Sequence, residues 1–509
     1  MEIEEIRDII RFASTYYSGD IGPLDLKNLS VEDSKLASFY KMLKDTKIQK
    51  DEDAADLIYG TPKLDTKYMF LKSNFTARAL NSIASLDLLQ PEISEYTRAV
   101  NKSYKQLFIL SILLRLGSRK GAISLAKKTL RLSEKFELHH VSVELLEKLR
   151  SHALQNGKRT EYEKYLKRLE WELAVLASES KVKTLEERLL IHSARSLYID
   201  ETLQEQARIA LVEMEQELAK YDTFMIRMAS FRMQYMYYQL TGNPLRSVIA
   251  CNNAISYMQG MPHMTLPTSI GEFELYKLEN YILARDYENG KQTAHTCSSY
   301  FTSGTNNWFL YKGYEFILLM HTLKFEEANS VYHEVTTHGR FHSQPAHLRE
   351  RWDIFRFYLD YVLDIHDQGT GGHPPRQSSL LRQTKYKKKI GEFPTYSADK
   401  RGFNVSILMM NILLLLENNK IDQLLEQVEA LSTYRFSHLK GKNSHQSAIL
   451  FRLILMMVRS DFDPVKMKKN APPLEKKLSS TRPSPTEIFE CVQVLPPEWI
   501  WARMKAALE

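Results

Sequence analysis

The stretch that decides the fold is Leu113–Leu130, with the sequence LLRLGSRKGAISLAKKTL. It passes from an apolar helix end, through a glycine turn, into a second helix with small or apolar residues at helical spacing. The same pattern returns at Ala153–Leu169 (ALQNGKRTEYEKYLKRL) and at Gln239–Ile255 (QLTGNPLRSVIACNNAI). Three copies of one turn predict a chain built from repeated helix pairs.

The spacing of the turns supports a repeat. Gly117, Gly157 and Gly242 are 40 and 85 residues apart, and 85 is close to two units. A period of roughly 20–50 residues is typical of stacked supersecondary units rather than of one compact enzyme domain. We therefore expect an all-α fold.

Weaker copies extend the register toward the C-terminus. Arg285 and Leu323 take the place of the glycine in two of them, and further turns are centred on Asn419 and at Ser460. Small residues recur on one face of the second helices, where they allow close approach of a neighbouring helix. These positions are Ala122, Ser247, Gly290 and Ala328, followed four residues later by Ala126, Cys251, Ala294 and Tyr332, with Ala207 and Leu211 in the same roles between Gly157 and Gly242.

Three regions follow from this register. Residues 1–66 lack the repeat pattern and are expected to form a helical cap or a small separate domain, because end repeats need a polar outer face. Residues 67–470 form the repeats, with an insertion near 366–400 that begins with HDQGTGGHPPR. Residues 471–509 are expected to be a linker rich in Pro, Lys and Ser, followed by a capping helix.

The pattern resembles the tetratricopeptide family of helical repeats. A large apolar residue ends the first helix, and a turn glycine is followed by a small residue five positions later, as in Gly117 and Ala122. The resemblance covers roughly residues 100–470, with units longer than that family's and without its early tryptophan. It implies a right-handed superhelix of antiparallel helix pairs, an α-solenoid, whose concave face is lined by the first helices and holds a peptide or a partner protein.

Bulk composition restricts the class of protein. The net charge of +7 is small for 509 residues, and three cysteines far apart fit neither a disulfide framework nor a zinc site. The N-terminus, MEIEEIRDII, is acidic where a signal peptide is basic, and the longest apolar run, Val405–Leu416, is too short to cross a bilayer. We expect a cytoplasmic protein that is not embedded in a membrane.

No set of residues suggests catalysis. Phosphate-binding glycine loops and nucleophile elbows are absent from the sequence, and Asp360 and Asp364, one turn apart, have no nucleophile nearby. His338 and His342 have a metal-ligand spacing, but Gly339 and Pro345 disfavour a helix there, so structural histidines are favoured over a metal site. We expect no enzyme, no cofactor and no metal.

Residues Phe231–Gln239 are the strongest candidate for recognition. Arg232, Met236 and Gln239 share one face of a helix that ends at Gly242, while Phe231, Tyr235 and Tyr238 share another that is expected to pack in the core. The resemblance puts the first stripe on the groove side, and the matching stripe one unit earlier includes His192 and Ser196. Methionine with polar side chains suits an extended peptide, although core or plain surface is an equally good interpretation.

A basic run near the insertion offers an alternative surface. Lys385, Lys387, Lys388 and Lys389 surround a tyrosine, a combination that can neutralise phosphates and stack on bases. A solvated helix face is the commoner explanation of such a run.

Three functions remain open from the sequence alone. The favoured one is a non-catalytic scaffold or regulator that binds a peptide or partner protein in the solenoid groove. The second is a ligand-responsive regulator whose superhelix changes shape on peptide binding. The third is nucleic-acid binding through residues 376–389.

Overall fold

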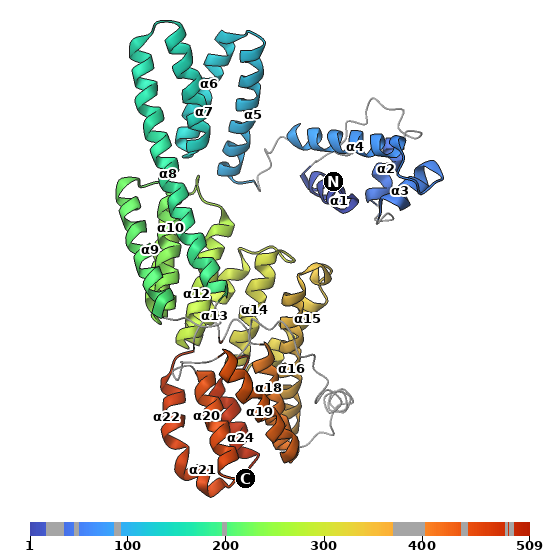
Figure 1. Cartoon of the computed structure of the whole chain (residues 1–509), viewed down its shortest axis with the longest axis vertical. Coiled ribbons are helices and arrows are strands. Elements are labelled where there is room, and N and C mark those ends of the chain that lie inside the picture. The colour runs from blue at the N-terminus through green and yellow to red at the C-terminus, as the bar shows by residue number, and fades with distance from the viewer. Residues whose placement is uncertain are drawn as a thin grey trace. The chain divides into compact units, whose positions relative to one another are not determined.

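The computed structural model describes residues 1–16, 35–44, 50–85, 93–195, 201–369, 403–438, 446–483, 487 and 493–508. In these residues every regular element is a helix, which confirms the all-α fold class (Figure 1). The helices are α1 (Ile3–Tyr16), α2 (Lys35–Lys44), α3 (Asp51–Tyr59), α4 (Thr66–Ser85), α5 (Glu95–Arg115), α6 (Arg119–Lys135), α7 (His139–Gln155), α8 (Arg159–Arg195), α9 (Glu201–Lys220), α10 (Phe224–Leu240), α11 (Pro244–Gly260), α12 (Pro267–Ala284), α13 (Tyr287–Ser298), α14 (Asn306–His321), α15 (Phe325–Thr336), the 3₁₀ helix η2 (Phe341–Ser343), α16 (Ala346–Gly369), α18 (Phe403–Glu417), α19 (Ile421–His438), α20 (Gln446–Arg459), α21 (Pro464–Asn470), α22 (Pro472–Ser480) and α24 (Pro497–Ala506).

The chain divides into two compact units, Met1–Lys105 and Gln106–Glu509. The first unit has its own core, in which Ile6 of α1 and Phe39 of α2 pack with Tyr68 and Phe75 of α4. Because α4 supplies part of this core, the first unit continues past residue 66, where the change in sequence pattern placed its end.

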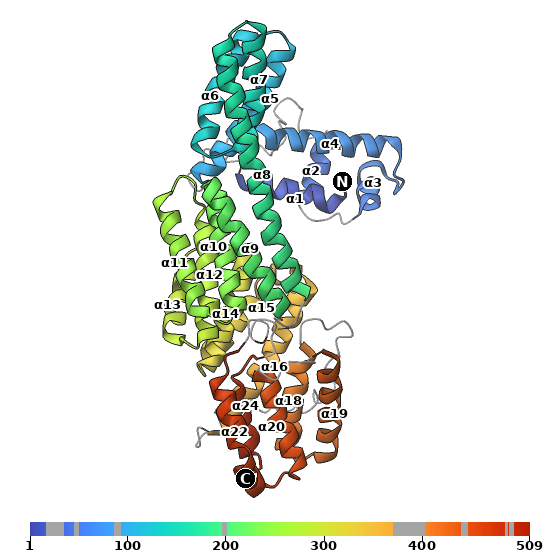
Figure 2. The same cartoon turned by 60° about the vertical axis from the view of Figure 1, so that its left-hand side comes forward.

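In the second unit, helices that follow one another in the chain pack side by side. Contacts join α6 to α7, α7 to α8, and each helix from α9 to α16 to the next. Figure 2 shows helices α10 to α14 gathered in one group. Buried apolar residues of α8 to α12 form one core cluster, and those of α12 to α24 form another.

The repeated turn has one backbone conformation wherever the structure describes it. The turn residue has a positive φ of 87° at Gly117, 62° at Gly157 and 71° at Gly242. Arg285 and Leu323, expected to replace glycine, have φ values of 58° and 57°. In each of these turns the next backbone N–H donates to the carbonyl five residues earlier at 2.8–2.9 Å, which caps the end of the first helix.

The C-terminal turns follow the same rule with one shift of register. Asn419 has a φ of 54°, as its predicted role requires. The expected turn centre at Ser460 is wrong by one residue, because the positive φ values, 50° and 58°, belong to Asp461 and Phe462. The N–H of Phe462 donates to the carbonyl of Met457. A turn of this type also lies between α6 and α7 at Glu137, with a φ of 50°, where the glycine pattern gave no signal.

Helix α8 departs from the pattern of separate pairs. It is one continuous helix of 37 residues that packs against α7 and also contacts α9 and α10 (Figure 2). The second helix of the Gly157 pair and the first helix of the next pair are therefore joined without a turn. Ala207 on α9 is fully buried, as its small-residue position predicts.

The C-terminal segment packs onto the last helices. Residues 472–480, expected to belong to a linker, form helix α22, which contacts α20 and α24. Ile500, Trp501 and Met504 of α24 are buried in the same core as α18 and α20. Most of the expected insertion, and the whole basic run at 385–389, lie outside the described residues.

Candidate ligand-binding groove

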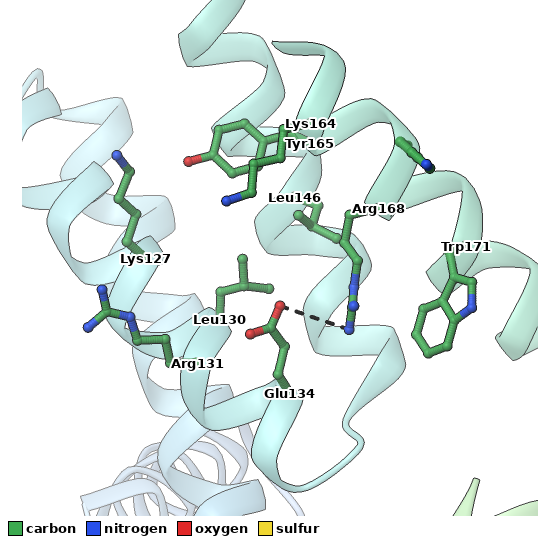
Figure 3. Close-up of a pocket in the computed structure, with 10 residues that line it drawn as sticks. Lys127, Leu130, Arg131, Glu134, Leu146, Lys164, Tyr165, Arg168 and Trp171 are labelled. Carbon is green, nitrogen blue, oxygen red and sulfur yellow. Dashed lines mark ion pairs between the residues drawn. The ribbon is translucent and has the colours of Figure 1, made fainter. Parts of the chain in front are cut away.

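A groove with a volume of about 680 Å³ lies along α6 and α8 (Figure 3). Residues three and four apart on a helix share a face, so Lys127, Arg131 and Glu134 of α6 form one wall. Lys164, Arg168 and Trp171 of α8 form the other wall by the same spacing. The full lining is Lys127, Leu130, Arg131, Glu134, Leu146, Lys164, Tyr165, Lys167, Arg168 and Trp171.

The position of α7 creates the groove. This helix contacts both α6 and α8 and holds them as the two walls. Its side chain Leu146 is almost fully buried and lies at the floor, near Leu130 of α6 (Figure 3). The site thus has an apolar floor and charged walls, and its volume falls within the range of roughly 300–1,000 Å³ that is common for ligand sites.

The charges of the groove are unbalanced. Five of its ten lining residues are Lys or Arg, and Glu134 is the only carboxylate among them. In the part of the chain that the structure describes, Arg131, Lys164 and Lys167 have no ion pair. Lys127 pairs with Glu161 at 3.9 Å, which is the limit of such a contact. An anionic ligand would supply the charge that the lining lacks.

Arg168 is the most tightly held cation of the groove. Its Nε donates a hydrogen bond to Oε1 of Glu172 at 2.9 Å, within α8. Its Nη2 lies 3.9 Å from Oε1 of Glu134 across the groove, and its guanidinium lies 4.5 Å from the centre of the Trp171 ring. The contact with Glu134 is the longer and the more exposed of its two ion pairs, so a ligand carboxylate could replace it.

Trp171 forms the aromatic end of the groove. Its side chain is 40% exposed, which leaves part of the indole ring open to a ligand. The ring is held from within the protein by edge contacts with His139, at 5.8 Å between centroids, and with Tyr221, at 6.5 Å. A fixed, half-exposed indole can pack against an apolar or aromatic side chain.

A buried polar cluster supports this end of the groove. Nδ1 of His139 lies 2.6 Å from Oε2 of Glu172, and its Nε2 lies 3.7 Å from Oε1 of Glu179. Burial would lower the pKa of His139, but the hydrogen bond with Glu172 and the charges of Glu179 and Glu137 outweigh it and raise that pKa. Burial raises the pKa of Glu179, against the opposing effects of His139 and Thr223.

The predicted stripe on α10 has partners within the chain. Arg232 forms an ion pair with Glu186 of α8 at 2.5 Å, and Met236 is 8% exposed. Gln239 donates a hydrogen bond to the hydroxyl of Tyr235 at 3.1 Å. These contacts account for the three side chains in the folded chain, and their role in binding stays a prediction.

The other predicted binding residues are not described. His192 belongs to α8, but its side chain lies outside the described residues, as does the whole of Ser196. Lys385, Lys387, Lys388 and Lys389 also lie outside them.

The described residues show no arrangement typical of a metal site or of a membrane span. Among the described residues, no three His, Cys, Asp or Glu side chains are arranged to hold a metal ion. The ring of His338 packs against Trp308 and Phe309, at centroid distances of 5.3 and 5.8 Å. No helix in the described ranges combines the length and apolar character needed to cross a membrane.

The described part of the chain is helical and holds a basic, partly apolar groove. Comparison of the chain with models of protein families, with curated proteins and with solved structures finds no match.

The sequence holds a signal for the groove that the repeat pattern alone did not bring out. Lys127 lies ten residues after Gly117, and Lys167 lies ten residues after Gly157. Equivalent positions of two neighbouring repeats thus carry the same charge, and stacking puts such positions side by side. Trp171 gave no signal of this kind, because its exposure depends on packing.

Proposed function

We propose that this chain is a non-catalytic helical-repeat protein that binds an acidic segment of a partner protein in the groove between α6 and α8. In this proposal the helix pairs form a right-handed superhelix of the tetratricopeptide type, and the protein acts as a scaffold or regulator. The observation that carries the proposal is the set of Arg131, Lys164 and Lys167, three cations of one groove without an ion pair in the described part of the chain.

The lining favours a peptide over a duplex nucleic acid. Leu130, Leu146, Tyr165 and Trp171 make the groove partly apolar, so a ligand gains by burying apolar side chains beside its charges. A duplex presents a row of phosphates and uses several separate contacts along its backbone. A short segment with alternating acidic and apolar residues matches the mixed lining better.

The groove differs from the site that the family resemblance implies. The resemblance puts the ligand on the first helices of the pairs, whereas this groove is lined by the second helices α6 and α8, with Leu146 from α7. We therefore propose binding on the side of the second helices.

Fluorescence anisotropy tests the proposal. The probe is a labelled peptide of about ten residues in which Asp and Glu alternate with Leu and Phe, and the comparison ligands are its Lys-substituted counterpart and a single-stranded oligonucleotide. Selective binding of the acidic peptide supports the proposal. Preference for the oligonucleotide, or no binding of the acidic peptide at low salt, contradicts it.

A matched pair of variants locates the binding. Changing Arg131, Lys164 and Lys167 to Glu should reduce peptide affinity by at least about 100-fold, because each reversal turns an attraction into a repulsion. The control changes Lys148, Lys420 and Lys476, all exposed and outside the groove, to Glu. It alters the net charge equally and should change affinity by less than about threefold.

A further inference from the structure

A line of polar side chains, most of them buried, leads from the groove to the start of α10. Arg168 donates to Glu172, and His139 joins Glu172 to Glu179, as described above. At the far end of the line, Oγ1 of Thr223 donates to Oε1 of Glu179 at 2.9 Å. Thr223 also accepts a hydrogen bond from the N–H of Ile226 and so caps the start of α10. Glu172 and His139 are 1% and 5% exposed.

We infer that His139 and Glu172 are positioning residues for Arg168, and that protonation of His139 strengthens the binding of an acidic ligand in the groove. This inference rests on the proposed function. It assigns to a buried histidine the control of a cation that lies at the surface.

The reason is a competition for the charge of Glu172. A buried carboxylate needs a compensating positive charge, and two groups, Arg168 and His139, can supply it. When His139 is protonated, its imidazolium balances Glu172, and Arg168 is free to share its charge with a ligand. When His139 is neutral, Arg168 alone balances Glu172, and less of its charge is available to the groove.

Trp171 couples the same histidine to the aromatic end of the groove. The indole contacts both the Arg168 guanidinium, at 4.5 Å, and the His139 ring, at 5.8 Å. A cation near an indole is attracted to its π system, so both groups act on the position of this ring. Loss of the charge on His139 therefore affects the cationic and the aromatic part of the groove together.

The groups that face His139 come from several elements. Glu172 and Glu179 belong to α8, Glu137 lies in the turn before α7, and His140 is its neighbour on α7. At the start of α10, the Thr223 hydroxyl donates to Glu179, and the N–H of Phe224 donates to Glu137 at 2.6 Å. Neither of these two donors titrates near neutrality. The carboxylates of Glu172, Glu179 and Glu137 favour the protonated form of His139. The affinity for the acidic ligand should therefore fall as pH rises through the pKa of His139.

The test measures affinity for the acidic peptide at pH values of about 6 and about 8.5. The intact chain should bind about threefold more weakly at the higher pH, the effect of one positive charge lost near the ligand in a screened environment. His139→Gln keeps a hydrogen-bond donor for Glu172 but does not titrate, so its affinity should be the same at both values. His140→Gln is the matched control and should keep the pH dependence of the intact chain.

A second measurement follows the protonation of His139 directly in the intact chain. Histidines labelled with ¹³C can be followed by NMR in the intact chain, and His139 is assigned by its loss in His139→Gln. By linkage, a saturating acidic peptide should raise the pKa of His139, and Arg168→Gln should reduce this effect.

The outcomes separate the two claims. Absence of peptide binding at every pH overturns the proposed function. Binding with a pH dependence that His139→Gln leaves intact, or an unchanged titration of His139 in the saturated complex, overturns the positioning role alone.

Discussion

The hydroxyl of Tyr235 on α10 donates a hydrogen bond to Oε2 of Glu279 on α12 at 2.6 Å. The Tyr235 ring stacks on Tyr276, also from α12, with 4.1 Å between ring centroids. Burial raises the pKa of Glu279 to about 7, although the hydrogen bonds from Tyr235 and Gln239 act in the opposite direction. A titrating carboxyl thus lies inside the packing of α10 against α12.

Glu279 makes stability depend on pH. Its pKa is about 7 in the folded chain and 4.5 in the ordinary state, so the folded chain keeps a proton that the unfolded chain releases between these values. The free energy of unfolding should therefore fall as pH rises from about 4.5 to about 7. Urea denaturation across this range should show that Glu279→Gln removes part of the decline.

The control for this experiment is Glu288→Gln. The Glu288 side chain is 85% exposed, so the substitution removes one carboxylate without changing the core. It should leave the pH dependence of unfolding unchanged. An identical effect of the two substitutions would show that the decline does not come from Glu279.

The left-handed turns should respond to substitution in opposite directions. Gly157 has a φ of 62°, and an added Cβ would meet nothing within 4 Å, so Gly157→Ala costs only backbone strain, about 1 kcal/mol of unfolding free energy. Leu323→Gly, at a φ of 57°, should stabilise the chain by about 0.5 kcal/mol. Chemical denaturation measures both, with Gly260→Ala as the control at ordinary φ. Equal effects of Gly157→Ala and Gly260→Ala would contradict the role of the turn.

The turn register could be predicted because it depends on local backbone geometry. The segments around Arg285, Leu323 and Asn419 align with the glycine turns in sequence, and all three residues have the positive φ of those turns. The continuous helix α8 could not be predicted in this way, because no local signal marks the missing turn between two units. Asp461 was missed by one residue, since the pattern around it contains neither a glycine nor an asparagine.

A close approach of α12 to the segment after α13 makes Gly271 sensitive to any side chain. A Cβ at this position of α12 would lie 2.6 Å from Cβ of Tyr300 and 3.0 Å from the Phe301 ring. The nearer atom cannot move away without its backbone, so Gly271→Ala should lower the unfolding free energy by about 2 kcal/mol. Denaturation curves should give a larger loss than for Gly157→Ala. A smaller loss would mean that α12 and the segment after α13 are packed less closely.

Replacement of Arg232 distinguishes a structural role from a binding role. Arg232→Met leaves the half-buried Glu186 without its partner and should lower the unfolding free energy by about 2 kcal/mol. Affinity for the acidic peptide should stay within about twofold, because Arg232 does not line the groove. Denaturation measures the loss of stability, and anisotropy measures the loss of affinity for the peptide. Unchanged stability with a large loss of affinity would restore the binding stripe predicted from the sequence.

The groove was harder to predict than the turns. Its cations come from two helices and are separated in the sequence by acidic residues such as Glu161 and Glu163, so no charged run marks them. Only the stacking of α6 and α8 on α7 brings Arg131 and Lys164 to one groove. The run at 385–389 is visible in the sequence because its charges follow one another along the chain.

Chemical cross-linking of the bound acidic peptide tests the binding claim most directly. A carbodiimide joins a carboxylate to a lysine amine without a spacer, so it marks only lysines in contact with the peptide's acidic side chains. Peptide mapping of the intact chain should find cross-links at Lys127, Lys164 and Lys167 that an excess of unlabelled peptide abolishes. Cross-links distributed among exposed lysines elsewhere, with none of these three enriched, would contradict the assignment of the groove as the binding site.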